Sequence, residues 1–280
     1  RIGFESPVVE IIDGQPVEFD PRTIPQRDIV ITDTTFRDGQ QARPPYTIDQ
    51  MVHIYDLLSR LSGPNGVIRQ SEFFIYSDRD REILEEVRSK GYRFPEVTAW
   101  IRANPADFEL VRRAGLKETG LLTSISDYHI FLKFKKSRRQ VLDDFMKVVR
   151  AAAEAGLDAI RCHYEDVTRA DFWGAVVPFT EELMEFSAHS GLRIKIRLCD
   201  TMGYGLPYAD AALPRSVPKL IYYLQREFGI PSRDLEWHGH NDFHKVHING
   251  VAAWLSGASS VNGTILGFGE RTGNSPLEAL

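Results

Sequence analysis

The sequence is poor in cysteine, in long apolar runs and in blocks of like charge. Cys162 and Cys199 are the only cysteines in 280 residues, which is too few for a disulfide scaffold, so we expect reduced thiols and a cytoplasmic protein. No apolar run has the length of a membrane span, and no charged and then apolar leader opens the chain, so we expect neither membrane insertion nor secretion. The net charge of −5 is spread without a basic block, which argues against nucleic acid and favours a small-molecule partner.

The chain does contain a regular alternation of short apolar runs and amphipathic helices. The first run is "DIVITD", and the helix after it is predicted from Thr47, which forms a capping box with Gln50, to Gly63-Pro64. Further apolar runs lie at 67–74, 94–100, 119–126, 157–166, 193–200, 234–240 and 259–269. Eight such units of about 30 residues predict a closed (β/α)8 TIM barrel, with a doubly wound sheet as the alternative.

The barrel is expected to span residues 29–280. Residues 1–28 carry prolines at positions 7, 16, 21 and 25, which favour an extended N-terminal arm or a short hairpin. An eighth helix has only begun at the final residues. We therefore expect it to be truncated at Leu280 and the natural protein to continue beyond that point.

Polar residues follow several of the predicted strands, where a TIM barrel places its active site. His238 and His240 are two residues apart on a strand end, so both project to the same side. With Asp38 after the first strand they form a mixed nitrogen and oxygen site for a divalent ion. The alternatives are two hydrogen-bonded histidines, and, for Arg37 and Asp38, a surface arginine and a turn aspartate. We favour the metal site, because a barrel brings these strand ends together.

Two further histidines follow in the same stretch, "HGHNDFHKVH". We assign His244 and His247 to the next helix, from about Phe243 to Leu255, where we expect packing or solvated side chains. On the fifth and sixth strands, polar residues share one side at two-residue spacing: Arg161, His163 and Glu165, then Lys195, Arg197, Cys199 and Thr201. They line the barrel mouth, or else Arg161 and Lys195 lie at the exposed strand starts. Glu165, nearest the strand end, is the candidate general base.

Together these motifs resemble the DRE-TIM metallolyase superfamily. Within it they are most similar to the Claisen-condensing branch of isopropylmalate, homocitrate, citramalate and Re-citrate synthases. The likeness runs from about Ile29 to Asn274 through "DTTFRDG", "ED", "DTMGYG", "HGHND" and "GERTGN". The last motif argues against the hydroxymethylglutaryl-CoA lyase branch, which carries a cysteine-bearing glycine loop near this point.

The resemblance implies a set of site residues. The metal ligands it implies are Asp38, His238, His240 and Asn274, with Mn²⁺ as the expected ion and Mg²⁺, Co²⁺ or Zn²⁺ as alternatives. It further implies that Arg37 steadies the enolate and the keto oxygen, that Glu165 acts in proton abstraction, and that Thr201 contacts the substrate carboxylate. On the inner side of the strands we add His163, Arg161 and Arg197 as substrate contacts, since a second carboxylate needs a cationic partner. Gly267 and Gly269 let a cofactor approach the backbone.

The activity implied is the metal-dependent condensation of acetyl-CoA with a 2-oxo acid. "RQSEFFIYSDRD" and "SDYHIFLKFKKSRRQ" look most like the members of the branch that use oxaloacetate and form citrate and CoA. The alternatives are isopropylmalate, homocitrate or citramalate synthesis, or a non-catalytic barrel that binds metal and 2-oxo acid. The resemblance also implies a homodimer or higher homo-oligomer. The basic stretch from Lys133 to Arg139 either receives the phosphates of CoA or is a solvated helix start.

Overall fold

The structure is a computed structural model that describes residues 8–12, 15–19 and 29–280. In the first part of the chain, β1 (Val8–Ile12) pairs antiparallel with β2 (Gln15–Phe19). The hairpin predicted for the N-terminal arm is therefore present in this part. The other residues of the predicted arm lie outside the described residues.

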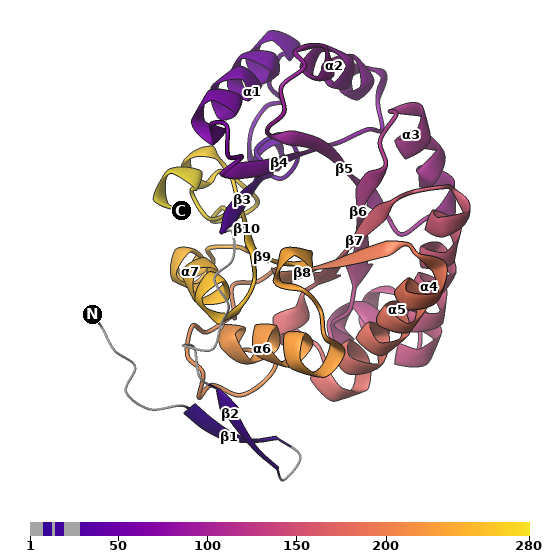
Figure 1. Cartoon of the computed structure of the whole chain (residues 1–280), viewed down its shortest axis with the longest axis vertical. Coiled ribbons are helices and arrows are strands. Elements are labelled where there is room, and N and C mark those ends of the chain that lie inside the picture. Colours follow the sequence, from indigo (N-terminus) through magenta and orange to yellow (C-terminus); the bar gives the residue numbers. More distant parts are fainter. Residues whose placement is uncertain (1–7, 13–14, 20–28) are drawn as a thin grey trace.

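Eight parallel strands close into a barrel, in the order β10-β3-β4-β5-β6-β7-β8-β9 (Figure 1). They are β3 (Val30–Asp33), β4 (Ile68–Phe73), β5 (Glu96–Arg102), β6 (Glu118–Ser124), β7 (Ala159–Glu165), β8 (Arg193–Asp200), β9 (Leu235–Gly239) and β10 (Ser260–Gly263). Because β10 pairs with both β9 and β3, the sheet has no edge. The TIM barrel is confirmed, and the doubly wound alternative is wrong.

Helices form a ring outside the strands (Figure 1). They are α1 (Ile48–Ser62), α2 (Asp78–Ser89), α3 (Phe108–Arg113), α4 (Arg138–Glu154), α5 (Val177–Ser190), α6 (Val217–Phe228) and α7 (Val246–Ser256). The capping box of Thr47 and Gln50 opens α1, and Gly63 closes it, as predicted. After β10 come two 3-10 turns, η8 (Ile265–Gly267) and η9 (Leu277–Ala279). None of the helices in the described part of the chain combines the length and apolarity that a membrane span requires.

The start of α7 differs from the prediction. The helix begins at Val246 and not near Phe243, because residues 241–245 form a turn. In that turn the His244 N–H donates to the Asn241 carbonyl at 2.9 Å, and His244 itself has a φ of 56°. The assignment of His244 to the helix is therefore wrong, whereas His247 does lie on α7.

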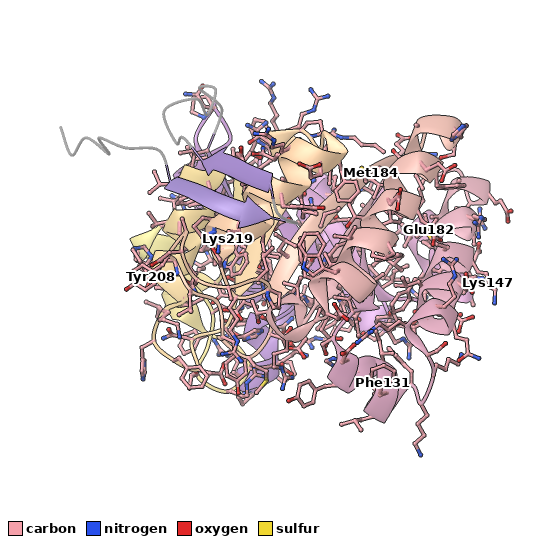
Figure 2. All side chains as sticks on the ribbon, turned by 90° about the horizontal axis from the view of Figure 1, so that it is seen from below. Phe131, Lys147, Glu182, Met184, Tyr208 and Lys219 are labelled. Carbon is pink, nitrogen blue, oxygen red and sulfur yellow. The ribbon has the colours of Figure 1, made fainter. Side chains whose placement is uncertain are left out.

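The apolar core lies between the strands and the helices. Outward-facing strand residues such as Ile160, Ile196 and Leu198 are fully buried there. Many charged side chains, in contrast, lie at the surface, and Figure 2 shows Lys147 of α4 at the outer edge of the molecule. Both cysteines are buried and free, so the expectation of reduced thiols fits the fold. The inside of the barrel is polar, unlike the branched apolar filling usual for this architecture.

Candidate active site

Three donor atoms converge beyond the ends of β3 and β9. The Nε2 atoms of His238 and His240 lie 3.3 Å apart, and each lies 3.7 Å from Asp38 Oδ2. All three side chains are buried. Gly239 ends β9 between the two histidines, and Asp38 follows β3 after a short turn. The structure therefore brings together the three residues that the sequence analysis selected as ligands.

The spacing of these donors is close to that of a site for a divalent cation. An ion about 2.1 Å from each nitrogen and oxygen holds neighbouring ligand atoms roughly 3.0–3.4 Å apart, so the two nitrogens lie within this range, and each lies slightly beyond it from Asp38 Oδ2. Asn274, the fourth expected ligand, donates from Nδ2 to Asp38 Oδ2 at 2.7 Å. Its own Oδ1 is buried and has no hydrogen-bond partner among the described residues. The amide nitrogen of Asn274 thus faces Asp38 while its oxygen lies against Gly269, and coordination of a cation by this oxygen stays a prediction.

A residue outside the predicted set orients His238. Nδ1 of His238 lies 2.7 Å from Oδ1 of Asn262, a buried residue of β10. Asn262 in turn donates from Nδ2 to the hydroxyl of Thr32 at 3.0 Å and to its carbonyl at 3.3 Å. Its Oδ1 must then accept from His238, which places the proton on Nδ1 and leaves the Nε2 lone pair directed at Asp38.

The electrostatics of the site favour the metal-binding protonation states. Burial lowers the pKa of His238 to about 3, and it also lowers the pKa of His240. Burial alone would raise the pKa of Asp38, but Arg37 and the two histidines hold it below its usual value. At neutral pH the cluster therefore consists of two neutral imidazoles and one carboxylate, the forms that bind a cation.

Arg37 lies beside the metal-ligand cluster and is not a surface residue. Its side chain is only 10% exposed, its Nη1 lies 3.3 Å from Asp38 Oδ1, and its Nε lies 2.8 Å from Glu72 Oε2. The guanidinium also lies over the ring of Trp100, 5.6 Å from its centre. The alternative of a surface arginine is therefore wrong. Glu72 and Trp100 were not identified from the sequence.

Below the site, charged side chains of alternating sign fill the barrel. We call this set the ion-pair column, and in order its members are Asp38, Arg37, Glu72, Arg197, Glu236, Arg161, Glu118 and Lys195. Arg197 bridges Glu72 at 2.8 Å and Glu236 at 3.0 Å, and Arg161 lies 2.8 Å from Glu236. Both arginines thus pair with internal acids. Their contact with a distal substrate carboxylate stays a prediction.

His163 lies deep in the barrel above Gly120. It is 2% exposed, and its Nε2 lies 3.7 Å from Glu72 Oε1 without a hydrogen-bond partner among the described residues. A Cβ atom at position 120 would stand 2.6 Å from this Nε2, so the glycine provides the space for the ring. Burial, followed by the charge of Arg197, lowers the pKa of His163 well below its usual value. A substrate contact of this neutral ring stays a prediction.

Glu165 ends β7 at the level of the metal-ligand cluster. It pairs in register with Cys199 of β8, which pairs with His238 of β9. Its side chain is 22% exposed and accepts a hydrogen bond from the Ser124 hydroxyl. Asp166 follows Glu165 in the chain, and its backbone N–H donates to the hydroxyl of Thr201 at 2.8 Å. The contact predicted between Thr201 and the substrate carboxylate stays a prediction.

The glycines of the loop after β10 allow that loop to return toward Asp38. A Cβ on Gly269 would stand 1.6 Å from Asn274 Oδ1. Gly267 has a φ of +67°, and its carbonyl accepts from the Asn274 N–H at 2.9 Å. Both glycines therefore help to hold Asn274 in its position. Their approach to a cofactor stays a prediction.

The basic stretch before α4 is largely paired with acids of the helical ring. Lys136 lies 2.6 Å from Asp144, and Arg138 lies 2.7 Å from Asp127. Arg139 pairs with residues of α4 and α5. These ion pairs favour the interpretation of a solvated helix start over a phosphate site.

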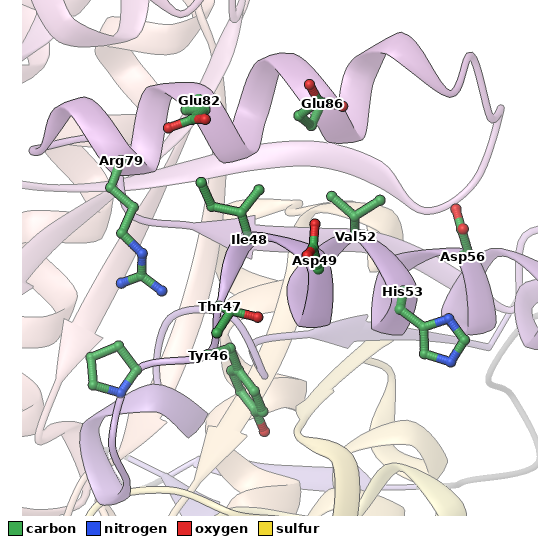
Figure 3. A pocket seen from close by; sticks show the side chains of 11 residues that line it. Tyr46, Thr47, Ile48, Asp49, Val52, His53, Asp56, Arg79, Glu82 and Glu86 are labelled. Atoms are coloured by element: carbon green, nitrogen blue, oxygen red, sulfur yellow. The ribbon is translucent and has the colours of Figure 1, made fainter.

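An open hollow of about 870 Å³ lies elsewhere, between α1 and α2. Figure 3 shows Ile48 and Val52 of α1 directed toward α2, with Glu82 and Glu86 on the facing helix. None of the predicted site residues lines this hollow. The candidate chemistry therefore lies at the barrel end and not in this hollow.

Comparison with known proteins places the barrel in a family. A family model described as HMGL-like matches residues 28–280, nearly the whole chain. The chain belongs to the HMGL-like family. The superfamily resemblance drawn from the motifs is thereby confirmed.

This HMGL-like chain is similar to two curated proteins over most of its length. It is 56% identical over 267 residues to the "Citrate (Re)-synthase" of Syntrophus aciditrophicus, covering 94% of this chain and 42% of that protein. It is 52% identical over 260 residues to the "Citrate (Re)-synthase" of Clostridium kluyveri, covering 93% of this chain and 57% of that protein. The chain thus spans about half the length of these relatives.

A solved structure supports the fold. The hydroxymethylglutaryl-CoA lyase of Pseudomonas aeruginosa matches with a TM-score of 0.68 and 21% identity, over 91% of this HMGL-like chain and 84% of that one. At this identity the likeness shows the barrel architecture alone.

Proposed function

We propose that the protein condenses acetyl-CoA with oxaloacetate and releases citrate and CoA. The observation that carries the proposal is the buried cluster of Asp38, His238 and His240 beside the Arg37 guanidinium. This arrangement suits a reaction that develops negative charge on an oxygen. The choice of oxaloacetate is supported by the names of the two citrate synthases that are 56% and 52% identical to the chain.

Each residue of the site has a role in this reaction. Asp38, His238, His240 and Asn274 hold a divalent ion, for which we expect Mn²⁺, with Mg²⁺, Co²⁺ or Zn²⁺ as alternatives. When bound, the ion supplies a Lewis acid that polarises the keto carbonyl. Arg37 donates to the oxygen on which charge develops. Glu165 removes a proton from the methyl group of acetyl-CoA.

The remaining contacts orient the substrates. Thr201 contacts the carboxylate next to the keto group, Arg161 or Arg197 meets the distal carboxylate, and His163 is a further substrate contact. The carbanion of acetyl-CoA then forms a bond to the keto carbon. Water hydrolyses the thioester and releases CoA as a thiol.

Thiol release tests this proposal against the related synthases. The protein at its natural length is stripped with a chelator, and CoA release is followed with acetyl-CoA and each 2-oxo acid, with and without Mn²⁺. We expect metal-dependent release with oxaloacetate and citrate as the product. A strong preference for 2-oxoisovalerate, 2-oxoglutarate or pyruvate would instead indicate isopropylmalate, homocitrate or citramalate synthesis.

Deuterium exchange separates an enzyme from a non-catalytic binding barrel. In D₂O we expect metal-dependent exchange into the methyl group of acetyl-CoA, because Glu165 must remove a methyl proton. Binding of metal and 2-oxo acid without exchange or thiol release would favour the binding barrel.

The assembly and compartment belong to the same proposal. We propose a homodimer or higher homo-oligomer in the cytoplasm, supported by the family resemblance and by two buried thiols that are free in the structure. Light scattering of the protein at its natural length measures the assembly.

A further inference from the structure

His129 approaches Glu165 from a short π-helix that follows β6. This segment is η4 (Tyr128–Lys133), and π-helical turns are uncommon and frequent at functional sites. Nε2 of His129 lies 3.6 Å from Glu165 Oε2. Both side chains are mostly buried yet reach solvent, with 17% and 22% of their surface exposed. Figure 2 shows Phe131 of the same segment at one end of the molecule.

The other side of the imidazole ring is fixed. Nδ1 of His129 lies 2.8 Å from the Ser126 hydroxyl, which also accepts from the His129 backbone N–H at 3.4 Å. Nδ1 lies 3.6 Å from Asp166 Oδ2 as well. Asp166 is fully buried and is held by Arg169 at 2.7 Å. The ring is therefore oriented through Nδ1, and Nε2 is directed at Glu165.

Two carboxylates flank the ring of His129. Glu165 faces Nε2 and Asp166 faces Nδ1. Arg169 pairs with Asp166 and stacks on Tyr128. Histidine is the side chain best suited to take up and release protons near neutral pH.

A general base must lose its proton before the next turnover. Glu165 already accepts a hydrogen bond from the Ser124 hydroxyl. The acid formed after proton abstraction therefore needs an acceptor that leads to solvent. His129, whose Nε2 lies 3.6 Å from Glu165 Oε2 and whose side chain reaches solvent, is placed to be this acceptor.

We propose that His129 positions Glu165 and relays its proton, an inference that rests on the proposed function. After Glu165 has taken a proton from the acetyl-CoA methyl group, its O–H bond breaks and an N–H bond forms at His129 Nε2. Glu165 returns to the carboxylate, and the imidazolium releases the proton to solvent.

Two variants test the relay. His129→Gln keeps a polar side chain beside Glu165 but cannot accept a proton, so we expect kcat to fall about 100-fold with KM for oxaloacetate unchanged. His129→Ala leaves space for free imidazole, which we expect to restore the rate in a saturable manner, more strongly as pH rises and more of it is neutral. Leu132→Ala, at a 70% exposed position of the same segment, is the matched control and keeps the wild-type rate.

Two results would overturn the relay. One is a wild-type kcat for His129→Gln, and the other is a slow His129→Ala that imidazole does not restore although its metal affinity is unchanged. Failure of the proposed function is seen separately, in the wild type. If the wild-type protein forms no citrate, the proposed function is wrong, and the relay that depends on it is wrong as well.

Discussion

The two histidines of the metal-ligand cluster are held to different degrees. Nδ1 of His238 is bound by Asn262, whereas Nδ1 of His240 is buried without a hydrogen-bond partner in the described part of the chain. A ligand fixed through its second nitrogen loses little freedom when it binds an ion. His238 is therefore the better organised of the two donors.

Replacement of His238 should weaken metal binding strongly. His238→Ala removes a fixed donor, and we expect the affinity for Mn²⁺ or Zn²⁺ to fall by more than about 100-fold. Competition with a chelating dye measures this affinity. His247→Ala is the control, since His247 lies on α7, and it should keep the wild-type affinity. Equal losses in both variants would contradict the assignment of His238.

The sequence contains part of this site but not all of it. The spacing of His238 and His240 is informative, because residues two apart on a strand share one side. Glu72 and Asn262 carry no such signal, since each is one of several polar residues in a short strand segment, "IRQSEF" or "SVNG". The pairing of β3 with β4 places Glu72 near Arg37, and the pairing of β9 with β10 sets Asn262 opposite His238, and neither strand register can be read from the sequence.

At the scale of elements, helix starts with a local cap were predictable and those without one were not. Thr47 caps α1 and Ser77 caps α2 through their side chains, so both starts follow from neighbouring residues. The start of α7 has no side-chain cap, and the preceding turn places His244 in a left-handed conformation. The sequence offers no glycine there, and the turn was missed.

A buried aspartate joins β3 to β4. Asp33 Oδ1 accepts from the Thr35 N–H at 3.0 Å, and Oδ2 accepts from the Ser71 hydroxyl at 2.8 Å. Burial outweighs these hydrogen bonds and raises the pKa of Asp33 from 3.8 to about 6. The fold thus favours the protonated carboxyl. Its contribution to the free energy of unfolding is complete below pH 3.8 and is lost as the pH rises through about 6.

Asp33→Asn should change this pH dependence. The amide stays neutral at every pH, so above pH 6 we expect the variant to be more stable than the wild type by up to about 3 kcal/mol. Urea unfolding at acidic and alkaline pH measures the difference. The same difference at both pH values would contradict the raised pKa of Asp33.

At the scale of the molecule, the ion-pair column joins strands on several sides of the barrel. Below Asp38 and Arg37, its carboxylates come from β4, β6 and β9 and its cations from β7 and β8, and three links join strands that are not neighbours: Arg197 with Glu72, Arg161 with Glu236, and Lys195 with Glu118. A buried charge that loses its partner costs far more than an exposed one. Arg197 pairs with both Glu72 and Glu236, so its loss would leave two buried carboxylates without this partner.

Arg197→Met should destabilise the fold. The variant leaves Glu72 and Glu236 without their shared cation, and we expect a loss of about 3–5 kcal/mol in the free energy of unfolding. Arg139→Met is the control, because Arg139 is 61% exposed in its ion pairs and should cost no more than about 1 kcal/mol. Urea unfolding measures both, and equal losses would contradict the importance of the ion-pair column.

The polar filling of the barrel also affects the response to temperature. Exposure of apolar surface raises the heat capacity of unfolding, whereas exposure of polar surface lowers it. A barrel filled with Glu, Arg and Lys therefore has a flatter stability curve than one of equal size filled with valine and leucine. The cost of dehydrating its charges also falls on heating. The charged interior therefore contributes relatively more to the free energy of unfolding at high temperature, where the stabilisation per area of buried apolar surface levels off.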